Sequence, residues 1–348
     1  MKKTMIALAT IAAVGAASAQ VSITGEAEWG FQSKTNAAGV TTSGIGLSTA
    51  QLKFAASEDL GNGMKASAGL SLNTGSQGAG ASSDDQSISL TTPMATIALA
   101  TSTSADWVSQ ASGAATWNGL DGKVLGARSA RDSLALVLPL ATGLTGTLSY
   151  AEAGGKVAWG TGSDGRPATE QPIYGASLKY ATGPATLQAA FVQFVGVNKV
   201  TDGSNDTLTR LGGKVDLGVA MVGAGLQIGK AGAGGTNTQT ALSVSAPLPG
   251  NFSAQAVFGS NNMDSSTGEA TVPIGRRTGY MLGLQYNLSK RTYAVFNAGS
   301  WTGVTAANAS AFALSSTTGA IGQTAASATA SIDSAATSMY YMSLVHDF

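Results

Sequence analysis

The sequence predicts an all-β protein, a transmembrane antiparallel β-barrel of about 16 strands. Three observations support this prediction. They are an N-terminal export signal, apolar and polar residues that alternate along the chain, and an alternation of short and long connections. The composition agrees with it. Only 11% of the 348 residues are charged and 46 are glycine, whereas soluble domains carry about 25% charged residues.

The composition also limits the chemistry that the chain can perform. It has 19 basic and 19 acidic residues, no cysteine, and a single histidine, His346. Nucleic-acid binding needs a basic surface, and cysteine- or histidine-based metal sites and nucleophiles need side chains that are missing here. No local arrangement of a nucleophile and a base stands out. We therefore predict no enzyme activity, no metal or other cofactor, and no nucleic-acid partner.

The first element is a secretory signal peptide. Lys2 and Lys3 precede an apolar run over residues 5–17, and Ala17-Ser18-Ala19 then provides a small-x-small cleavage site. The run is too short to span a membrane as a helix. We expect residues 1–19 to be removed and residues 20–348 to form the barrel domain. No later stretch has 18 consecutive apolar residues, so an exported chain of this kind can reside in a membrane only as a barrel.

The next segment sets the pattern for the rest of the chain. Apolar residues occupy one parity from Val21 to Phe31, and polar residues, Glu26 and Glu28 among them, occupy the other. Such alternation is typical of a strand with one apolar face. It recurs over residues 51–56, 64–73, 133–138, 174–180, 280–286 and 340–348.

The connections between these strands fall into two kinds. Short ones at 57–63, 247–251 and 287–290 carry glycine, asparagine or proline, and long ones occupy 74–86, 102–129, 154–171, 261–275 and 305–337. Outer-membrane barrels have short periplasmic turns and long external loops. About 20 residues per strand and connection give about 16 strands, a size that encloses water. Aromatic residues near the strand ends, including Trp29, Tyr174, Tyr286, Tyr293 and Phe348, are predicted to form interfacial girdles.

Three segments resemble one family. Phe54-Ala55-Ala56-Ser57-Glu58-Asp59-Leu60-Gly61-Asn62-Gly63-Met64-Lys65-Ala66, Tyr286-Asn287-Leu288-Ser289-Lys290-Arg291-Thr292 and His346-Asp347-Phe348 are similar to segments of Gram-negative general porins of the neisserial and β-proteobacterial type. Val21-Ser22-Ile23-Thr24-Gly25 is similar too. The resemblance extends over residues 20–348 in register.

The resemblance implies an outer-membrane homotrimer of 16-stranded barrels for passive diffusion of small hydrophilic solutes and ions. It implies contact with outer-membrane lipid, and a barrel assembly machinery that reads Phe348 as the assembly signal. It also implies that a third external loop, here within 102–129, folds into the lumen as a constriction. The charged residues Asp106, Asp121, Lys123 and Arg128 would lie in that loop.

The chain departs from the family at positions that normally carry arginine on the lumen wall. Gln51 and Ala55 stand on the second strand, Ala135 on the sixth and Val345 on the last, and the strand that enters the constriction loop ends in Ala100-Thr101. These positions have the polar parity, so lipid contact does not explain them. Because lumen residues tune selectivity, we predict a weaker transverse field and a weaker anion preference than the family norm.

By parity and position, the candidate pore-lining residues are Glu26, Glu28, Lys53, Lys65, Asp106, Asp121, Lys123, Arg128 and Arg131, with Lys179, Arg210 and Lys214 as further candidates. The alternative interpretation is that they are solvated rim or loop charges without a role in selectivity. Two other functions also stay open. One is an adhesin or structural barrel whose long loops bind a partner. The other is a narrow, substrate-specific channel.

Overall fold

A computed structural model gives the structure of the chain. It describes residues 20–36, 39–73, 82–103, 108, 120, 123–125, 130–153, 171–195, 207–230, 235–263, 275–302 and 336–348. At several strand ends only the backbone is described. The predicted signal peptide, 1–19, lies outside the described residues.

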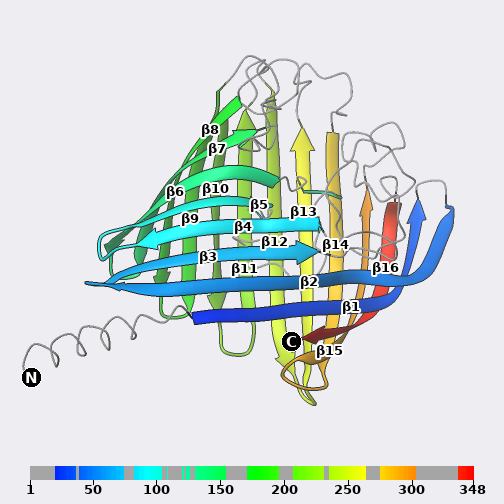
Figure 1. Cartoon of the computed structure of the whole chain (residues 1–348). Helices are drawn as coiled ribbons and strands as arrows, with labels where there is room; N and C mark the ends of the chain where they lie inside the picture. Colours follow the sequence, from blue (N-terminus) through cyan, green and yellow to red (C-terminus); the bar gives the residue numbers. More distant parts are fainter. Residues whose placement is uncertain are drawn as a thin grey trace, which may run out of the picture.

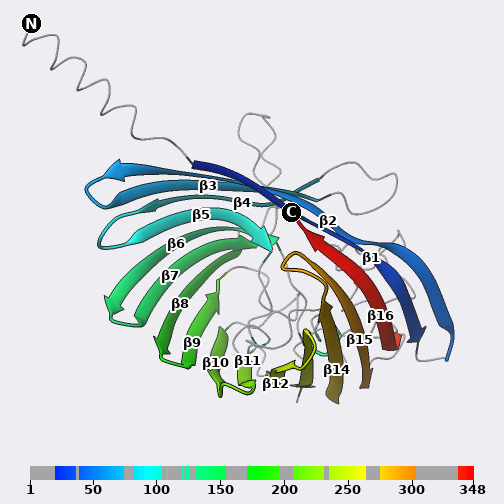
Figure 2. The ribbon, with the colours of Figure 1, turned by 90° about the horizontal axis from the view of Figure 1, so that it is seen from below.

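The described residues form a closed barrel of sixteen strands, in which every strand is antiparallel to both neighbours and β16 pairs with β1 (Figures 1 and 2). The predicted fold and strand number are therefore confirmed. The strands are β1 Gln20–Asn36, β2 Thr41–Gly61, β3 Met64–Asn73, β4 Ser82–Thr91, β5 Thr96–Thr103, β6 Ala130–Ala141, β7 Leu144–Ala153, β8 Gln171–Thr182, β9 Ala185–Phe194, β10 Thr207–Asp216, β11 Met221–Lys230, β12 Thr236–Leu248, β13 Phe252–Met263, β14 Gly275–Asn287, β15 Thr292–Thr302 and β16 Ala336–Asp347.

Tight turns follow the even-numbered strands, and the connection from β1 to β2, residues 37–40, is also short. The turn between β2 and β3 has φ angles of +80°, +53° and +76° at Gly61, Asn62 and Gly63, and Asn251 between β12 and β13 has a φ of +67°. Glycine and asparagine are the residues that adopt this left-handed conformation most readily. Because each turn reverses the chain within a few residues, neighbouring strands start pairing next to the turn.

The register places alternate residues on opposite faces of the wall. Between β1 and β2, Ile23 pairs with Phe54 on the outer face, and Thr24 pairs with Lys53 on the inner face. Large apolar side chains such as Ile23 and Ile45 are exposed on the outside. The period-two pattern of the sequence therefore gives the outer face that it predicts.

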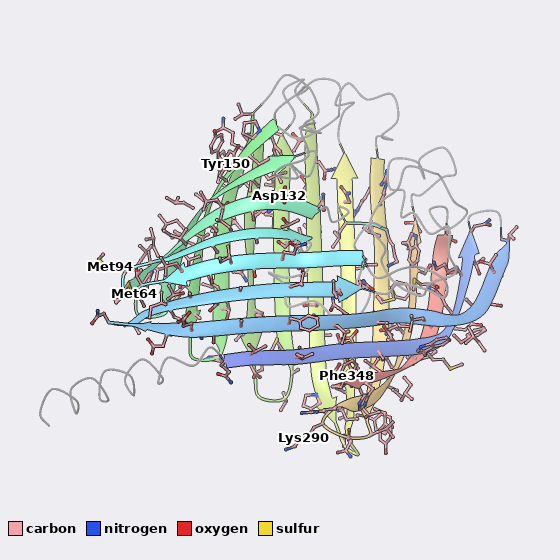
Figure 3. The ribbon with its side chains drawn as sticks, in the orientation of Figure 1. Met64, Met94, Asp132, Tyr150, Lys290 and Phe348 are labelled. Atoms are coloured by element: carbon pink, nitrogen blue, oxygen red, sulfur yellow. The ribbon has the colours of Figure 1, made fainter. Side chains whose placement is uncertain are left out.

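The ring closes between the first and last strands. The Gly25 amide donates to the Phe348 carbonyl at 2.9 Å, and the Phe348 amide donates to the Gly25 carbonyl at 3.0 Å. A Cβ atom at position 25 would lie 2.6 Å from Cε2 of the Phe348 ring, so glycine leaves room for the ring against β1. Figure 3 shows Phe348 at the end of β16, beside β1.

Candidate functional site

The inner wall has a neutral side. At the central inward positions of β3 to β8, which the register aligns from strand to strand, the residues are small and uncharged. They are Ser67, Gly69, Ser87, Ser89, Ala98, Ala100, Ser133, Ala135, Thr147, Ser149, Gly175 and Ser177. Ser71, the next inward residue on β3, instead lies between Lys53 on β2 and Asp85 on β4. Hydroxyl groups and exposed backbone make this side of the wall wettable without giving it a net charge.

Part of the opposite side of the inner wall is apolar, and there the sequence-based expectation of a polar inner face is wrong. The inner apolar patch is formed by inward-facing, buried residues on β12 to β16: Ala241, Val257, Met281, Trp301, Met339 and Tyr341. These residues form one hydrophobic cluster with Val108, Leu120, Val124 and Leu125 of the loop between β5 and β6. Apolar side chains can face inward here because the loop covers them and keeps water away.

The described part of this loop lies inside the barrel, as the resemblance implied. Val108, Leu120, Val124 and Leu125 have no accessible surface. The Leu120 carbonyl accepts hydrogen bonds from the amides of Lys123, Val124 and Leu125 at 3.1, 2.9 and 3.0 Å. This compact turn directs the side chains of Val124 and Leu125 to the same wall that Leu120 contacts.

The charged candidates on β1 and β2 come together near the closing seam. Glu26 faces inward and pairs with Gln51 on β2 and with Asp347 on β16. The Glu28 carboxylate accepts a hydrogen bond from the Ser343 hydroxyl at 2.5 Å. Lys53 lies one inward position away from Gln51 along β2. An arc of three carboxylates and one ammonium group thus lies on the inner wall.

The other basic candidates on the strands lie elsewhere. Lys65 is exposed at the start of β3, where it pairs with Asp59 beside a short turn, so it belongs to the mouth of the barrel. Lys179 and Lys214 occupy inward positions close to the short turns that follow β8 and β10. Arg210 faces inward on β10, and its Nε donates to Gln227 Oε1 at 2.7 Å.

The loop candidates are only partly described. The Lys123 ammonium lies 5.7 Å from the centroid of the Trp301 ring, a cation–π distance. Arg131 pairs through its backbone with Ser102, and its side chain lies outside the described part of the structure. Asp106, Asp121 and Arg128 also lie outside the described residues.

Several inward charged residues were missed by sequence reasoning, Lys34 opposite the buried Met339 among them. Two others lie on β16 and β14. Asp347 pairs with Glu26, and Arg277 on β14 is only 4% exposed and pairs with Asn261. The signal was present, since both positions have the inward parity of their strands. One girdle prediction was wrong: Tyr293 faces inward, opposite the buried Val345. β15 begins at Thr292, which pairs with His346 on the outer side, so the next residue, Tyr293, points into the barrel.

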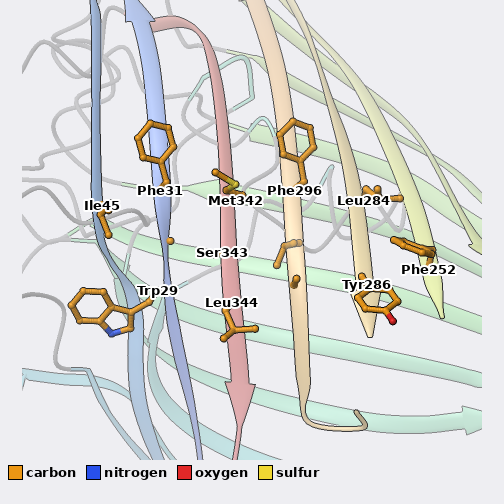
Figure 4. A pocket seen from close by; sticks show the side chains of 13 residues that line it. Trp29, Phe31, Ile45, Phe252, Leu284, Tyr286, Phe296, Met342, Ser343 and Leu344 are labelled. Atoms are coloured by element: carbon orange, nitrogen blue, oxygen red, sulfur yellow. The ribbon is translucent and has the colours of Figure 1, made fainter. Parts of the chain in front are cut away.

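The outer face carries aromatic residues around an apolar hollow at the seam. Its lining includes Trp29, Phe31, Phe252, Tyr286 and Phe296, and Figure 4 shows them projecting from β1, β13, β14 and β15. The rings of Phe252 and Tyr286 are 4.6 Å apart. Tyrosine and tryptophan on the outer face are typical of the interfacial belts of membrane barrels.

Neither a helical membrane span nor a metal centre is found in the described part of the chain. No helix there is long and apolar enough to cross a membrane. No three His, Cys, Asp or Glu residues of that part are grouped in a way that could hold a metal ion.

A family model of Gram-negative porins matches residues 4–305. The chain belongs to this family. Among solved structures, an anion-selective porin from Comamonas acidovorans is 19% identical, with a TM-score of 0.65 over 95% of this chain and 100% of that chain. Variants of the Rhodopseudomonas blastica porin are 13% identical, with a TM-score of 0.59 over 94% of this chain and 100% of theirs. No curated protein matches.

Family and fold together establish the general function. The protein is an outer-membrane, multi-pass β-barrel that forms a channel for passive diffusion of solutes. Porins are channels rather than enzymes. The inner wall and the loop that packs against it are therefore the parts of the chain that determine which solutes pass through the channel.

Proposed function

We propose that this porin conducts small hydrophilic solutes and ions with only a weak preference for anions. The observation that carries the proposal is the absence of positive charge at five inward wall positions: Gln51, Ala55, Ala100, Ala135 and Val345. A family member with arginine at such positions would expose a cationic strip to the passing solute. Here the strip is replaced by an amide and short apolar side chains.

The charges at the closing seam support the same conclusion. Glu26, Glu28 and Asp347 lie on one arc of the inner wall, with Lys53 beside them. Charges separated by more than a Debye length, about 10 Å at 0.1 M salt, are largely screened from one another. The arc therefore acts locally, and its carboxylates oppose anion entry near the seam. The loop candidates are balanced, since Asp106 and Asp121 are matched by Lys123 and Arg128.

The comparison with the Comamonas porin sharpens the expectation. That protein is named as anion-selective, and at 19% identity its likeness to this chain concerns the fold. We propose that the two channels share the barrel and differ in selectivity, because selectivity depends on a few lumen side chains rather than on the barrel itself.

We further propose that the porin assembles as a homotrimer and that Phe348 is the signal read by the barrel assembly machinery. The family membership supports the trimer. Support for the signal comes from the position of Phe348, whose backbone completes the pairing with Gly25 and whose ring stacks 6.4 Å from that of His346. Cross-linking of the native protein in detergent tests the trimer, and a ladder that stops at the monomer would contradict it.

Reversal potentials of the reconstituted native protein, measured between KCl solutions of unequal concentration, test the selectivity. We expect a potential close to zero. The matched control is the Gln51→Arg, Ala135→Arg double variant, which restores positive charge at two inward positions and should shift the potential toward anion selectivity. A large anion-selective potential in the unmodified protein would refute the proposal, because other basic residues would then rebuild the field.

A further inference from the structure

A row of very small residues crosses the inner wall beneath the loop. Register pairs connect Gly212 on β10 to Gly225 on β11, then to Ala241 on β12, Gly259 on β13 and Gly279 on β14. All five face inward at the same height, and the row ends at Trp301 on β15, the partner of Gly279. Because four of the five have no side chain, the row forms a trench across the wall.

Larger residues border the trench on both sides. The next inward row toward the long loops consists of Arg210, Gln227, Gln239, Asn261 and Arg277. On the side of the short turns, the border consists of Ser243, Val257 and Met281 on β12 to β14, whereas on β11 the neighbouring inward residue is Gly223, which leaves the trench open there. The trench is therefore lower than its borders by about the depth of one side chain.

The loop occupies this trench. A Cβ atom at Gly225 would lie 2.5 Å from the Val108 carbonyl oxygen, one at Gly259 would lie 2.7 Å from Leu120 Cδ1, and one at Gly279 would lie 2.8 Å from Val124 Cγ2. Each distance is shorter than real Cβ atoms show. At these three positions, any residue with a side chain would prevent the loop from lying as close to the wall as it does.

We propose that Gly225, Gly259 and Gly279 set the width of the channel by recessing the constriction loop into the wall. Ordinary van der Waals contacts of a Cβ atom begin at 3.4 Å, so a methyl group at Gly225 would move the Val108 carbonyl oxygen about 1 Å toward the pore axis. A loop that lies in the trench fills less of the lumen. The space between the loop and the neutral side, β3 to β8, is then wider for passing solutes. The inference extends the channel function and does not depend on the proposed ion selectivity.

The experiment measures single-channel conductance and the size limit for neutral polymers in Gly225→Ala, Gly259→Ala and Gly259→Val. We expect a stepwise loss of conductance from glycine to alanine to valine at position 259, with smaller polymers excluded at each step. The matched controls are Gly69→Ala and Gly69→Val, on an inward position of β3 where the nearest atom to a new Cβ is the Ser87 hydroxyl at 3.1 Å. The controls should conduct like the unmodified protein.

Heat-dependent gel mobility shows whether each variant folds into a barrel. Should Gly259→Val fail to fold, the two alanine variants decide, since each adds one methyl group. Unchanged conductance in folded variants would overturn the proposal. A rise in conductance would also overturn it, because the loop would then leave the lumen instead of narrowing it. An equal loss in the Gly69 variants would mean that any added wall side chain narrows the pore, and would overturn it too.

Discussion

Replacing Leu120 by alanine should release the constriction loop from the wall. Leu120 has no accessible surface and belongs to the cluster that joins the loop to the inner apolar patch. Truncating a buried leucine to alanine costs about 2–5 kcal/mol, and about 1.4 kcal/mol corresponds to a tenfold change in an equilibrium. The fraction of molecules with a detached loop should therefore rise by about thirtyfold at the lower end of this range.

Trypsin provides the assay, because Lys123 lies within the turn whose amides bond to the Leu120 carbonyl. Cleavage after Lys123 requires that turn to open, and in the regime of fast opening and closing the cleavage rate follows the open population. We expect the rate, followed by mass spectrometry of the fragments, to rise by the same factor, together with noisier single-channel currents. The control is Leu282→Ala on the outer face of β14, where the side chain is 51% exposed. If folded Leu120→Ala channels are cleaved no faster than the control, the apolar patch does not hold the loop.

Three further predictions concern the wall and its seam. The Gln51→Arg, Ala135→Arg double variant should shift the reversal potential toward anion selectivity; an unchanged potential would show that these positions do not face the ion path. Gly25→Val should lower the melting temperature of the folded barrel, because the new side chain overpacks the Phe348 ring at a cost of about 1–3 kcal/mol; heat-dependent gel mobility measures it, and an unchanged transition would contradict the seam geometry. Phe348→Ala should reduce the amount of folded porin in isolated outer membranes, while equal amounts would argue against an assembly signal.

The strands and the outer face could be predicted because their signals are local. Alternation from Val21 to Phe31, and turn residues such as Asn62, are readable within a few positions of the chain. The closed order of strands then follows from antiparallel neighbours joined by short turns.

The dry part of the interior could not be predicted in this way. Val257 and Met281 look like exceptions to a polar face until the loop that covers them is in place, and that cover comes from more than a hundred residues earlier in the chain, around Leu120 and Val124. The trench is equally nonlocal. Gly225 and Gly259 are ordinary glycines in a glycine-rich sequence, and only the pairing register places them in one row.

The inner apolar patch makes the barrel mechanically uneven. Over β12 to β16 the sheet is the middle of three layers, with hydrocarbon on one side and the loop on the other, whereas β3 to β8 form a single layer between hydrocarbon and water. Local opening is easiest where few apolar contacts hold a segment. Amide hydrogens on the single-layered side should therefore exchange with solvent first, and the three-layered side should be the last part of the molecule to come apart.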